Sequence, residues 1–578
     1  MALRKEVSIS IFSFLFLAFL AVGLGFFYRL PALDRRPMHA DEAILGMKLA
    51  DYWQDGHFEY DPKDYHGPAL HQVTASWGKF TAWGDPSTWT DGDLRLVVAL
   101  TGFGVMLSAL LFAGPLGRLG TVLAMLMTAV SPMMVYYSRY FIMEMQLTLL
   151  VMLTLGCFWR FSQNGGRLWL ILGGMALGFA HATKETFIIN VGAALAGWIV
   201  ARIMIGDFQP RKSNSLSLSS SRSKKGVSAP WLWVLAPALL VSVASYSGGF
   251  RDWQAVQDSF FTFGHYFERS EGSGHEKPWH YYLTLLVYHK DGLVWSEAMI
   301  VVLGLIGMVY ALVGEFKNTA RQALLVFLSV YTLALIGVYS LLSYKTPWCI
   351  LSAQHSLTLL AGAGAGWLWT IFTGRISHLL FTVAISSGLW FSCWQTKFVN
   401  DEYRADQRNP YAYSHTTTDL LRLVNEVKTI AADRGESFSA QVINRDSGWP
   451  LPWYWRTLTK VGYQMAVPAQ LTSPVIIVEA EQLPQVKLAL GDRAASYTES
   501  GPYGLRPGVY LTLLVQKEKA PEPQPVAPVI PPAAPAPEST APVAPPAGTL
   551  NAAPTLTPSG PGLPVLPGMP MPLPGTQP

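Results

Sequence analysis

Long apolar runs separated by short polar segments dominate the first two thirds of the chain. Each run is about 20 residues long, which as an α-helix is enough to cross a hydrocarbon core of about 30 Å. The pattern predicts a polytopic α-helical membrane protein with about eleven spans. Their approximate ranges are 8–30, 95–114, 119–137, 141–160, 167–184, 186–204, 230–247, 292–314, 322–343, 349–373 and 375–393.

Composition agrees with this pattern and excludes other classes of protein. Of the 578 residues, 50% are hydrophobic and only 14% are charged, against about 25% in an average soluble domain. A net charge of +4 is too small for a typical nucleic-acid binder. Three cysteines without paired spacing exclude a disulfide scaffold and a cysteine-based zinc site. The first apolar run lacks a clear cleavage site, so we expect a retained helix rather than a signal peptide.

The loop charges predict the orientation of the spans. Basic residues gather in alternate loops, most densely in 205–229, so the positive-inside rule places the N-terminus in the cytoplasm. An odd number of spans then puts the C-terminus outside. The outer segments are 31–94, 138–141, 248–291 and the junctions near 184 and 344, and they are rich in His, Asp, Glu, Tyr and Trp. This asymmetry predicts that the chemistry occurs outside the cytoplasm.

After the predicted membrane domain, 1–393, the pattern changes to that of a small soluble domain, 394–518. Helical patterns cover 417–435 and 481–490, and strand-like patterns cover 438–444, 474–480 and 509–516, which together predict an α/β domain. The remaining segment, 519–578, contains 20 of the 40 prolines and is predicted to be a disordered tether.

The first outer loop contains two groups of polar residues that suit acid–base chemistry. His39, Asp41 and Glu42 follow the first span closely, and His66 follows two further aspartates, Asp61 and Asp64. Carboxylates and imidazoles are the usual groups that accept or donate protons in catalysis. The alternative is a solvated loop in which Asp41 stabilises the N-terminus of a helix.

Two further outer junctions carry charges at the edges of apolar runs. Arg139 and Glu144 flank the start of the fourth span, and a carboxylate inside an apolar run is costly unless it faces a polar cavity or a partner. Pairing of these two residues is the structural alternative. Lys184 and Glu185 lie at the end of the fifth span, where the lysine either binds a ligand or extends to the membrane surface.

The later outer segments hold histidines and one more cation. His265, His275 and His280 lie within 16 residues and could form a metal site. Their spacing matches no compact metal-binding pair, so no metal ligands are assigned. Lys345 precedes Trp348 at the ninth span, which suits either a lipid phosphate or an interfacial anchor.

The combination of these groups on one side is more informative than any single one. Acids are needed to deprotonate an acceptor, and cations such as Arg139, Lys184 and Lys345 offset the charge of an anionic lipid head group. A lipid phosphate that leaves during transfer requires such cations in the transition state. The pattern is that expected for sugar transfer from a lipid carrier.

Several motifs resemble those of the membrane glycosyltransferases of the C-type fold, which include protein O-mannosyltransferases and aminoarabinose transferases. They are HADEA, YHGPALHQVTA, SRYFIMEM, TKE and YKTPWC, in this order along the chain. The chain is most similar to a prokaryotic branch, the flippase activity-associated glycosylation proteins, whose soluble-domain signature matches WPLPWYWR at 449–456. The resemblance spans residues 8 to about 515.

This resemblance implies a function and a set of site residues. It implies a polyprenyl-phosphate sugar donor, an inverting transfer in a prokaryotic cell membrane, Asp41 as general base, and Glu42 as a residue that orients either Asp41 or the acceptor. Some relatives bind a divalent cation and others do not, so a metal cofactor stays open. The substrate-binding candidates are His39, His66, Arg139, Glu144, Lys184, Glu185, His265, His280 and Lys345.

A non-catalytic role is the second hypothesis. An accessory protein of a lipid-linked-sugar flippase, or a transporter, would use the same outer cleft to hold the lipid head group. Transporters often carry symmetric broken helices at the bilayer centre, and the sequence has no such pair. The candidate polar residues gather at the outer ends of the spans, which favours an enzyme. The sugar, the acceptor, the polyprenol length and the oligomeric state are not indicated.

Overall fold

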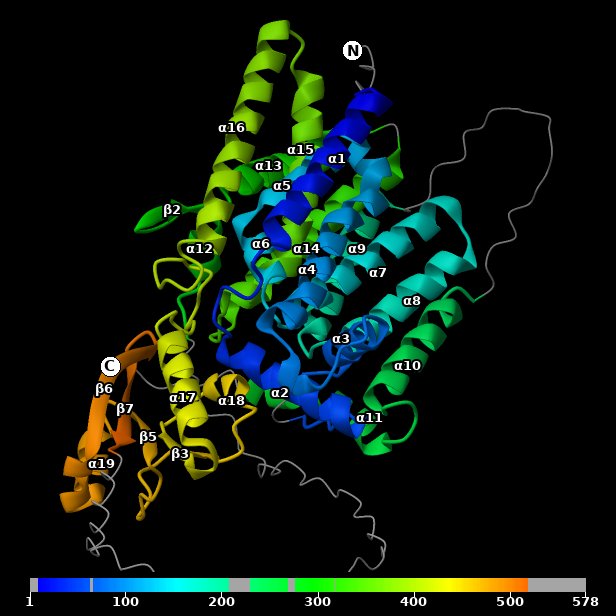
Figure 1. The fold of residues 1–578 in the computed structure, drawn as a ribbon. Helices are drawn as coiled ribbons and strands as arrows, with labels where there is room; N and C mark the ends of the chain where they lie inside the picture. The colour runs from blue at the N-terminus through cyan, green and yellow to red at the C-terminus, as the bar shows by residue number, and fades with distance from the viewer. Residues whose placement is uncertain are drawn as a thin grey trace, which may run out of the picture.

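The computed structural model describes residues 9–62, 66–206, 229–268, 276–316, 318–446 and 448–517, with side chains throughout except at 263–268. A bundle of long helices forms the larger part, and a smaller sheet-containing domain lies at one end of it (Figure 1). The start of α1 lies at the opposite end of the bundle. The predicted tail, 519–578, lies outside the described residues.

Helices occupy every predicted apolar run. Among the described residues, six helical segments are long and apolar enough to cross a membrane, and three shorter apolar helices accompany them. The run 119–137 is divided, because Ser131 caps a new helix that has Pro132 at its first position. The helices are α1 (Ile11–Arg29), α4 (Asp91–Ser108), α5 (Ala113–Val130), α6 (Pro132–Ser138), α7 (Glu144–Asn164), α8 (Arg167–His181), α9 (Phe187–Ile205), α10 (Leu232–Tyr246), α13 (Ala298–Val313), α14 (Thr319–Leu341), α15 (Leu351–Ile371) and α16 (Arg375–Asn400).

Apolar side chains cover the outside of the bundle, as lipid contact requires. Phe12 and Phe19 of α1 are 78% and 76% exposed, and α16 presents a similar surface. Inside, close helix contacts use glycine: a Cβ on Gly120 of α5 would lie 2.7 Å from the carbonyl oxygen of Gly362 on α15. Small residues at helix crossings are typical of membrane bundles.

Short elements between the spans form the end of the bundle that faces the small domain. The first outer loop folds into α2 (Ala40–Asp55), α3 (Ala69–Phe80) and the 3₁₀ turn η1 (Pro86–Thr88), and the later outer segment holds α11 (Trp253–Glu268) and α12 (Tyr281–Val287). The predicted span 292–314 starts later than expected: β1 (His289–Asp291) and β2 (Leu293–Trp295) form a hairpin around Gly292, whose φ is +65°. The turn η3 (Pro347–Ile350) precedes α15.

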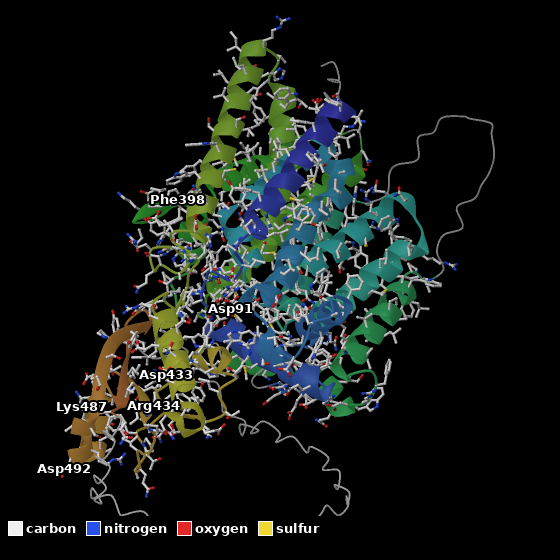
Figure 2. The ribbon with its side chains drawn as sticks, viewed as in Figure 1. Asp91, Phe398, Asp433, Arg434, Lys487 and Asp492 are labelled. Atoms are coloured by element: carbon white, nitrogen blue, oxygen red, sulfur yellow. The ribbon has the colours of Figure 1, made fainter. Side chains whose placement is uncertain are left out.

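The C-terminal domain is a five-stranded sheet with helices on its faces. The strand order is β4-β3-β5-β7-β6, with β4, β3 and β5 parallel and β7 antiparallel to both of its neighbours. Asp433, Lys487 and Asp492 lie on this domain, away from the bundle (Figure 2). The elements are α17 (Leu420–Arg434), η4 (Gly435–Ser437), β3 (Ala440–Ile443), α18 (Leu451–Tyr454), β4 (Val461–Gln464), β5 (Val475–Glu479), α19 (Leu483–Leu490), η5 (Gly491–Ser496), β6 (Tyr497–Arg506) and β7 (Val509–Gln516).

Candidate active site

Glu42 is a structural anchor of the first outer loop. Its carboxylate accepts two hydrogen bonds from Arg95, each of 2.7 Å, and a third of 2.8 Å from the Phe141 amide. It also accepts from the His39 backbone N–H, which completes a capping box at the start of α2. Burial acts to raise the pKa of Glu42, but Arg95 and Arg36 outweigh it and hold the pKa at about 2.

Asp41 faces a different environment although it is the preceding residue. Its side chain is 45% exposed, so the carboxylate is open to an incoming molecule. Its backbone N–H donates to Nδ1 of His39 at 3.1 Å, and the same nitrogen lies 3.6 Å from Asp41 Oδ2. Burial lowers the pKa of His39, which favours the neutral imidazole that this hydrogen bond requires.

Aromatic rings surround His39 and connect it to the bundle. The ring centroids of Tyr140, His415 and Trp348 lie 5.5, 5.6 and 6.1 Å from that of His39. Trp348 is nearly buried, at 6% exposure, and lies in the turn before α15. One indole therefore lies between the cap of the Asp41 helix and the interior of the bundle.

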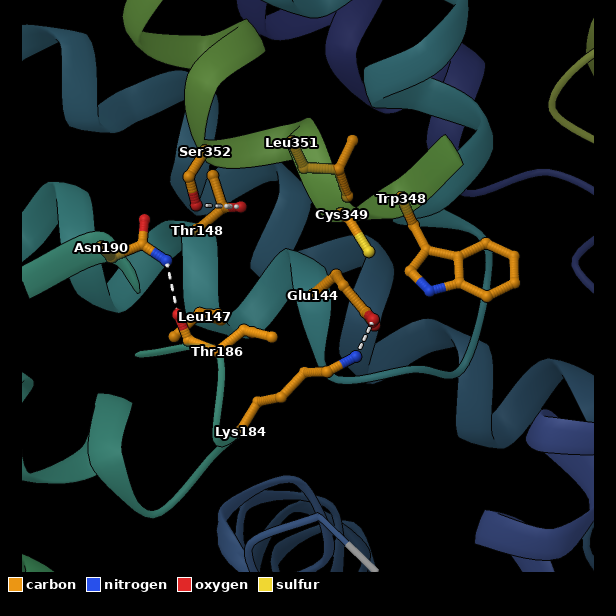
Figure 3. A pocket seen from close by; sticks show the side chains of 10 residues that line it. All are labelled: Glu144, Leu147, Thr148, Lys184, Thr186, Asn190, Trp348, Cys349, Leu351 and Ser352. Carbon is orange, nitrogen blue, oxygen red and sulfur yellow. Dashed lines mark hydrogen bonds and ion pairs between the residues drawn. The ribbon is translucent and has the colours of Figure 1, made fainter. Parts of the chain in front are cut away.

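Behind Trp348 lies a small polar cavity (Figure 3). It has about 10 Å³ of space for water, which is room for roughly one molecule. Lys184 donates a hydrogen bond to Glu144 at its edge, and both side chains are buried. Thr148 and Ser352 form a hydrogen bond of 3.1 Å on the opposite wall. The cavity is lined by Glu144, Leu147, Thr148, Lys184, Thr186, Asn190, Trp348, Cys349, Leu351 and Ser352.

Hydrogen bonds connect the segment that carries Lys184 to the first outer loop. His66 Nδ1 donates to Glu185 at 2.8 Å, and the Ala69 amide donates to the carbonyl of Ala182 at 2.9 Å. Burial acts to raise the pKa of Glu185, but the His66 ring and Lys184 hold it at about 2. The structure thus brings His66, Lys184 and Glu185 together in one region.

Arg139 has a different environment from the one its charge suggested. Its guanidinium donates to the carbonyls of Tyr28 and Ala32, both at 3.0 Å. These carbonyls belong to the end of α1 and the turn after it, so Arg139 completes the C-terminus of that helix. The alternative of a pair between Arg139 and Glu144 is not what the structure has, because Glu144 binds Lys184 instead.

Lys345 and His280 lie apart from the cavity lining. The Lys345 amine is buried and donates to the carbonyl of Lys277 at 2.9 Å and to that of Leu342. It caps the chain leaving α14 rather than presenting a free charge. His280 is exposed at the start of α12. The side chain of His265 lies outside the described residues.

Solved structures of the same architecture exist. ArnT from Cupriavidus metallidurans, in a crystal structure bound to undecaprenyl phosphate, matches with a TM-score of 0.55 at 14% identity, over 87% of this chain and 98% of that chain. The chain has the C-type glycosyltransferase fold. The predicted fold class is therefore confirmed. An oligosaccharyltransferase from Archaeoglobus fulgidus also matches, with a TM-score of 0.48 at 11% identity over 77% of this chain and 63% of that chain.

A family model covers part of this fold. Residues 76–245 match the model described as dolichyl-phosphate-mannose-protein mannosyltransferase. The matched segment includes Glu144, Lys184 and Glu185 and stops before Trp348. No curated protein is similar enough in sequence to be matched.

Three residues of the candidate site, Arg95, Tyr140 and His415, were not predicted from the sequence. Arg95 is fully buried at the edge of a predicted span, and a buried arginine in such a position signals a partner, here Glu42. Tyr140 carried no signal beyond its place in the outer motif. His415 lies in the segment that leads into the C-terminal domain, and nothing in its local pattern indicated a contact with His39.

The described residues do not fit a divalent-cation site around Asp41. Within the described ranges, no group of three or more His, Cys, Asp or Glu side chains lies close enough together to hold a metal ion. Glu42 supplies no second ligand because Arg95 and the Phe141 amide occupy its carboxylate.

Proposed function

We propose that this protein is a membrane glycosyltransferase that moves a sugar from a polyprenyl-phosphate carrier to an acceptor hydroxyl, with inversion, on the extracytoplasmic side. The observation that carries the proposal is the position of Trp348. Its ring contacts His39, the cap of the Asp41 helix, and its side chain also lines the cavity that holds Lys184. One indole therefore borders both the residue that caps the Asp41 helix and the cavity that holds a buried cation.

Asp41 is the general base in this proposal. A base must reach the acceptor proton, and the Asp41 carboxylate is partly exposed whereas that of Glu42 is buried against Arg95. Glu42 contributes by holding the first turn of α2, which fixes the direction of the Asp41 side chain. Of the two roles that the resemblance implied for Glu42, orienting Asp41 or orienting the acceptor, the proposal adopts the first.

Lys184 is the cation for the leaving phosphate. The charge on the phosphate oxygen grows as the sugar–oxygen bond breaks, and a buried ammonium stabilises it most strongly where water is scarce. The hydroxyls of Thr148 and Ser352 offer further polar contacts in the same cavity. Because the cavity admits about one water, binding a phosphate group there requires Trp348 or the turn at 182–186 to shift.

The reaction is a single displacement. The acceptor oxygen forms a bond to the anomeric carbon, the bond from that carbon to the phosphate oxygen breaks, and Asp41 takes the acceptor proton. The lipid phosphate leaves with the bonding electron pair. Attack from the side opposite the phosphate inverts the anomeric centre.

The similarities support a lipid-linked donor. ArnT is described as bound to undecaprenyl phosphate, and the family model is described by a dolichyl-phosphate-mannose donor. Of these two descriptions only that of the family names a sugar, and it matches part of the chain, so hexose and pentose donors are both to be tested.

The test is a transfer assay with the full chain in nanodiscs. A panel of radiolabelled polyprenyl-phosphate hexoses and pentoses is offered with and without chelator, using wild type, Asp41→Asn and the matched control Asp55→Asn, an exposed residue at the far end of α2. We expect sugar release from one donor by wild type and Asp55→Asn, and a loss of about 100-fold or more in Asp41→Asn. Saturable carrier binding without turnover of any donor would contradict the proposal and favour the flippase-accessory alternative.

A further inference from the structure

The tryptophan-rich segment 449–456 of the C-terminal domain has no role in the reaction proposed above. It forms α18, and α18 contacts α2 of the first outer loop. Two of its side chains bind one carboxylate: Trp453 Nε1 donates to Asp91 Oδ1 at 2.8 Å, and the Tyr454 hydroxyl donates to Asp91 Oδ2 at 3.0 Å. Asp91 is the first residue of α4 and lies where the bundle meets the C-terminal domain (Figure 2).

The Tyr454 hydroxyl also reaches the start of the Asp41 helix. It accepts a hydrogen bond of 2.7 Å from the backbone N–H of Met38. Met38 directly precedes His39, the residue that caps α2 and binds the Asp41 amide. One hydroxyl therefore joins the C-terminal domain, α4 and the chain three residues before the proposed base.

The ring of Trp453 fixes the same helix further along. Trp453 is fully buried, and a Cβ added to Gly46 of α2 would lie 2.8 Å from its ring. The Arg456 guanidinium lies over the indole, 4.0 Å from its ring centroid, and donates to the carbonyls of Pro86, at 3.1 Å, and Trp89. The C-terminal domain thus holds α2 by direct packing as well as by hydrogen bonds.

We infer that Trp453 and Tyr454 are positioning residues for Asp41. The C-terminal domain then contributes to the transfer reaction through the position of α2. The inference rests on the proposed role of Asp41. Neither residue lines the Lys184 cavity, so their loss disturbs the base and leaves the carrier site intact. The expected signature is a lower kcat with an unchanged KM for the donor.

The test uses the full chain in nanodiscs and the variant Tyr454→Phe. Its matched control is Tyr497→Phe, which removes a hydroxyl that donates to the Ser473 carbonyl at 2.9 Å inside the same domain. Amide hydrogen exchange of the segment 37–43 reports the start of α2 without any substrate. We expect Tyr454→Phe to speed this exchange and to lower kcat, each by about tenfold, the equivalent of one buried hydrogen bond. Tyr497→Phe is expected to change neither.

A second variant approaches the same contact from the other side. Gly46→Ala pushes α2 away from the Trp453 ring, so it is expected to reproduce the faster exchange and the lower kcat although the Tyr454 hydroxyl is still present. Wild-type exchange of 37–43 in Tyr454→Phe, or an equal effect of Tyr497→Phe, would overturn the inference. Absence of transfer by the wild type would instead overturn the proposed function, and the exchange result separates the two failures.

Discussion

Two neighbouring regions of the outer end use charge in opposite ways. Around Glu42 every charged group meets a partner within the chain: Arg95 clasps the carboxylate, and Arg139 is bonded to the end of α1. Between Asp41 and Lys184, by contrast, one carboxylate is exposed, and one ammonium, although paired with Glu144, borders a cavity. Successive residues of a helix point about 100° apart, so Asp41 and Glu42 enter these two regions from one turn of α2. Buried charges enclosed by partners build the fold, and charges at the surface or beside a cavity are the candidates for chemistry.

The largest effect is expected from breaking the partnered region. Glu42→Gln leaves the Arg95 guanidinium buried without its counter-charge, which should lower the free energy of unfolding by about 3–5 kcal/mol. Asp41→Asn, one residue earlier and partly exposed, should change it by less than about 0.5 kcal/mol. Thermal unfolding of both variants in the same detergent measures the contrast. Equal stability of the two would show that the regions are not distinct.

Neutralising the cavity should remove transfer and preserve the fold. Lys184→Met alone would leave Glu144 buried and unpaired, so the informative variant combines it with Glu144→Gln. We expect this double variant to unfold near the wild-type temperature and to transfer sugar about 100-fold more slowly, because the leaving phosphate loses its cation. Transfer within tenfold of wild type would place the carrier phosphate elsewhere.

Arg139 provides a milder test of the same contrast. Arg139→Lys keeps the charge but loses the geometry that binds the carbonyls of Tyr28 and Ala32, at an expected cost of about 1–2 kcal/mol in stability. The donor KM should stay within about twofold of wild type. A tenfold rise in donor KM, measured with the identified carrier, would show that Arg139 contacts the donor phosphate.

The smallest effect concerns pH. Burial lowers the pKa of His39 below 6.5, so its neutral form stabilises the fold above that pH and the contribution is lost as pH falls through and below it. Asparagine caps helices well and does not titrate, so His39→Asn should keep the cap. When the pH falls from 7.5 to 5.5, the free energy of unfolding should therefore decrease less in His39→Asn than in wild type, by up to about 1 kcal/mol. Unfolding temperatures at the two pH values test this. His415, which also lies beside His39, is present in both proteins and so does not contribute to the difference between them. Identical pH dependence would show that His39 is not the titrating cap.

The fold class followed from the sequence because membrane helices and buried strands have strong apolar patterns. The five predicted elements of the C-terminal domain coincide with α17, β3, β5, α19 and β7. The strand β6 was missed because its sequence is polar and broken by Gly501-Pro502, with an irregular register against β7. Such an edge strand is defined by its neighbour rather than by its own pattern.

The candidate site was only partly accessible to the same reasoning. Spacing brought out Asp41, Lys184 and Glu144, because charges at the edges of apolar runs need an explanation. Their partners were not predictable: Arg95 meets Glu42 across 53 positions, and Lys184 meets Glu144 across 40. Local sequence also cannot distinguish a cation that binds backbone carbonyls, such as Lys345, from one that borders a cavity.

The most direct test of the account separates carrier binding from transfer in two variants. Asp41→Asn and the Lys184→Met/Glu144→Gln double variant are compared with wild type by equilibrium binding of the polyprenyl phosphate and by single-turnover transfer from the identified donor. The account predicts that Asp41→Asn binds the carrier with the wild-type Kd but transfers at least about 100-fold more slowly, whereas the double variant binds the carrier more weakly. Wild-type single-turnover transfer by Asp41→Asn would contradict it.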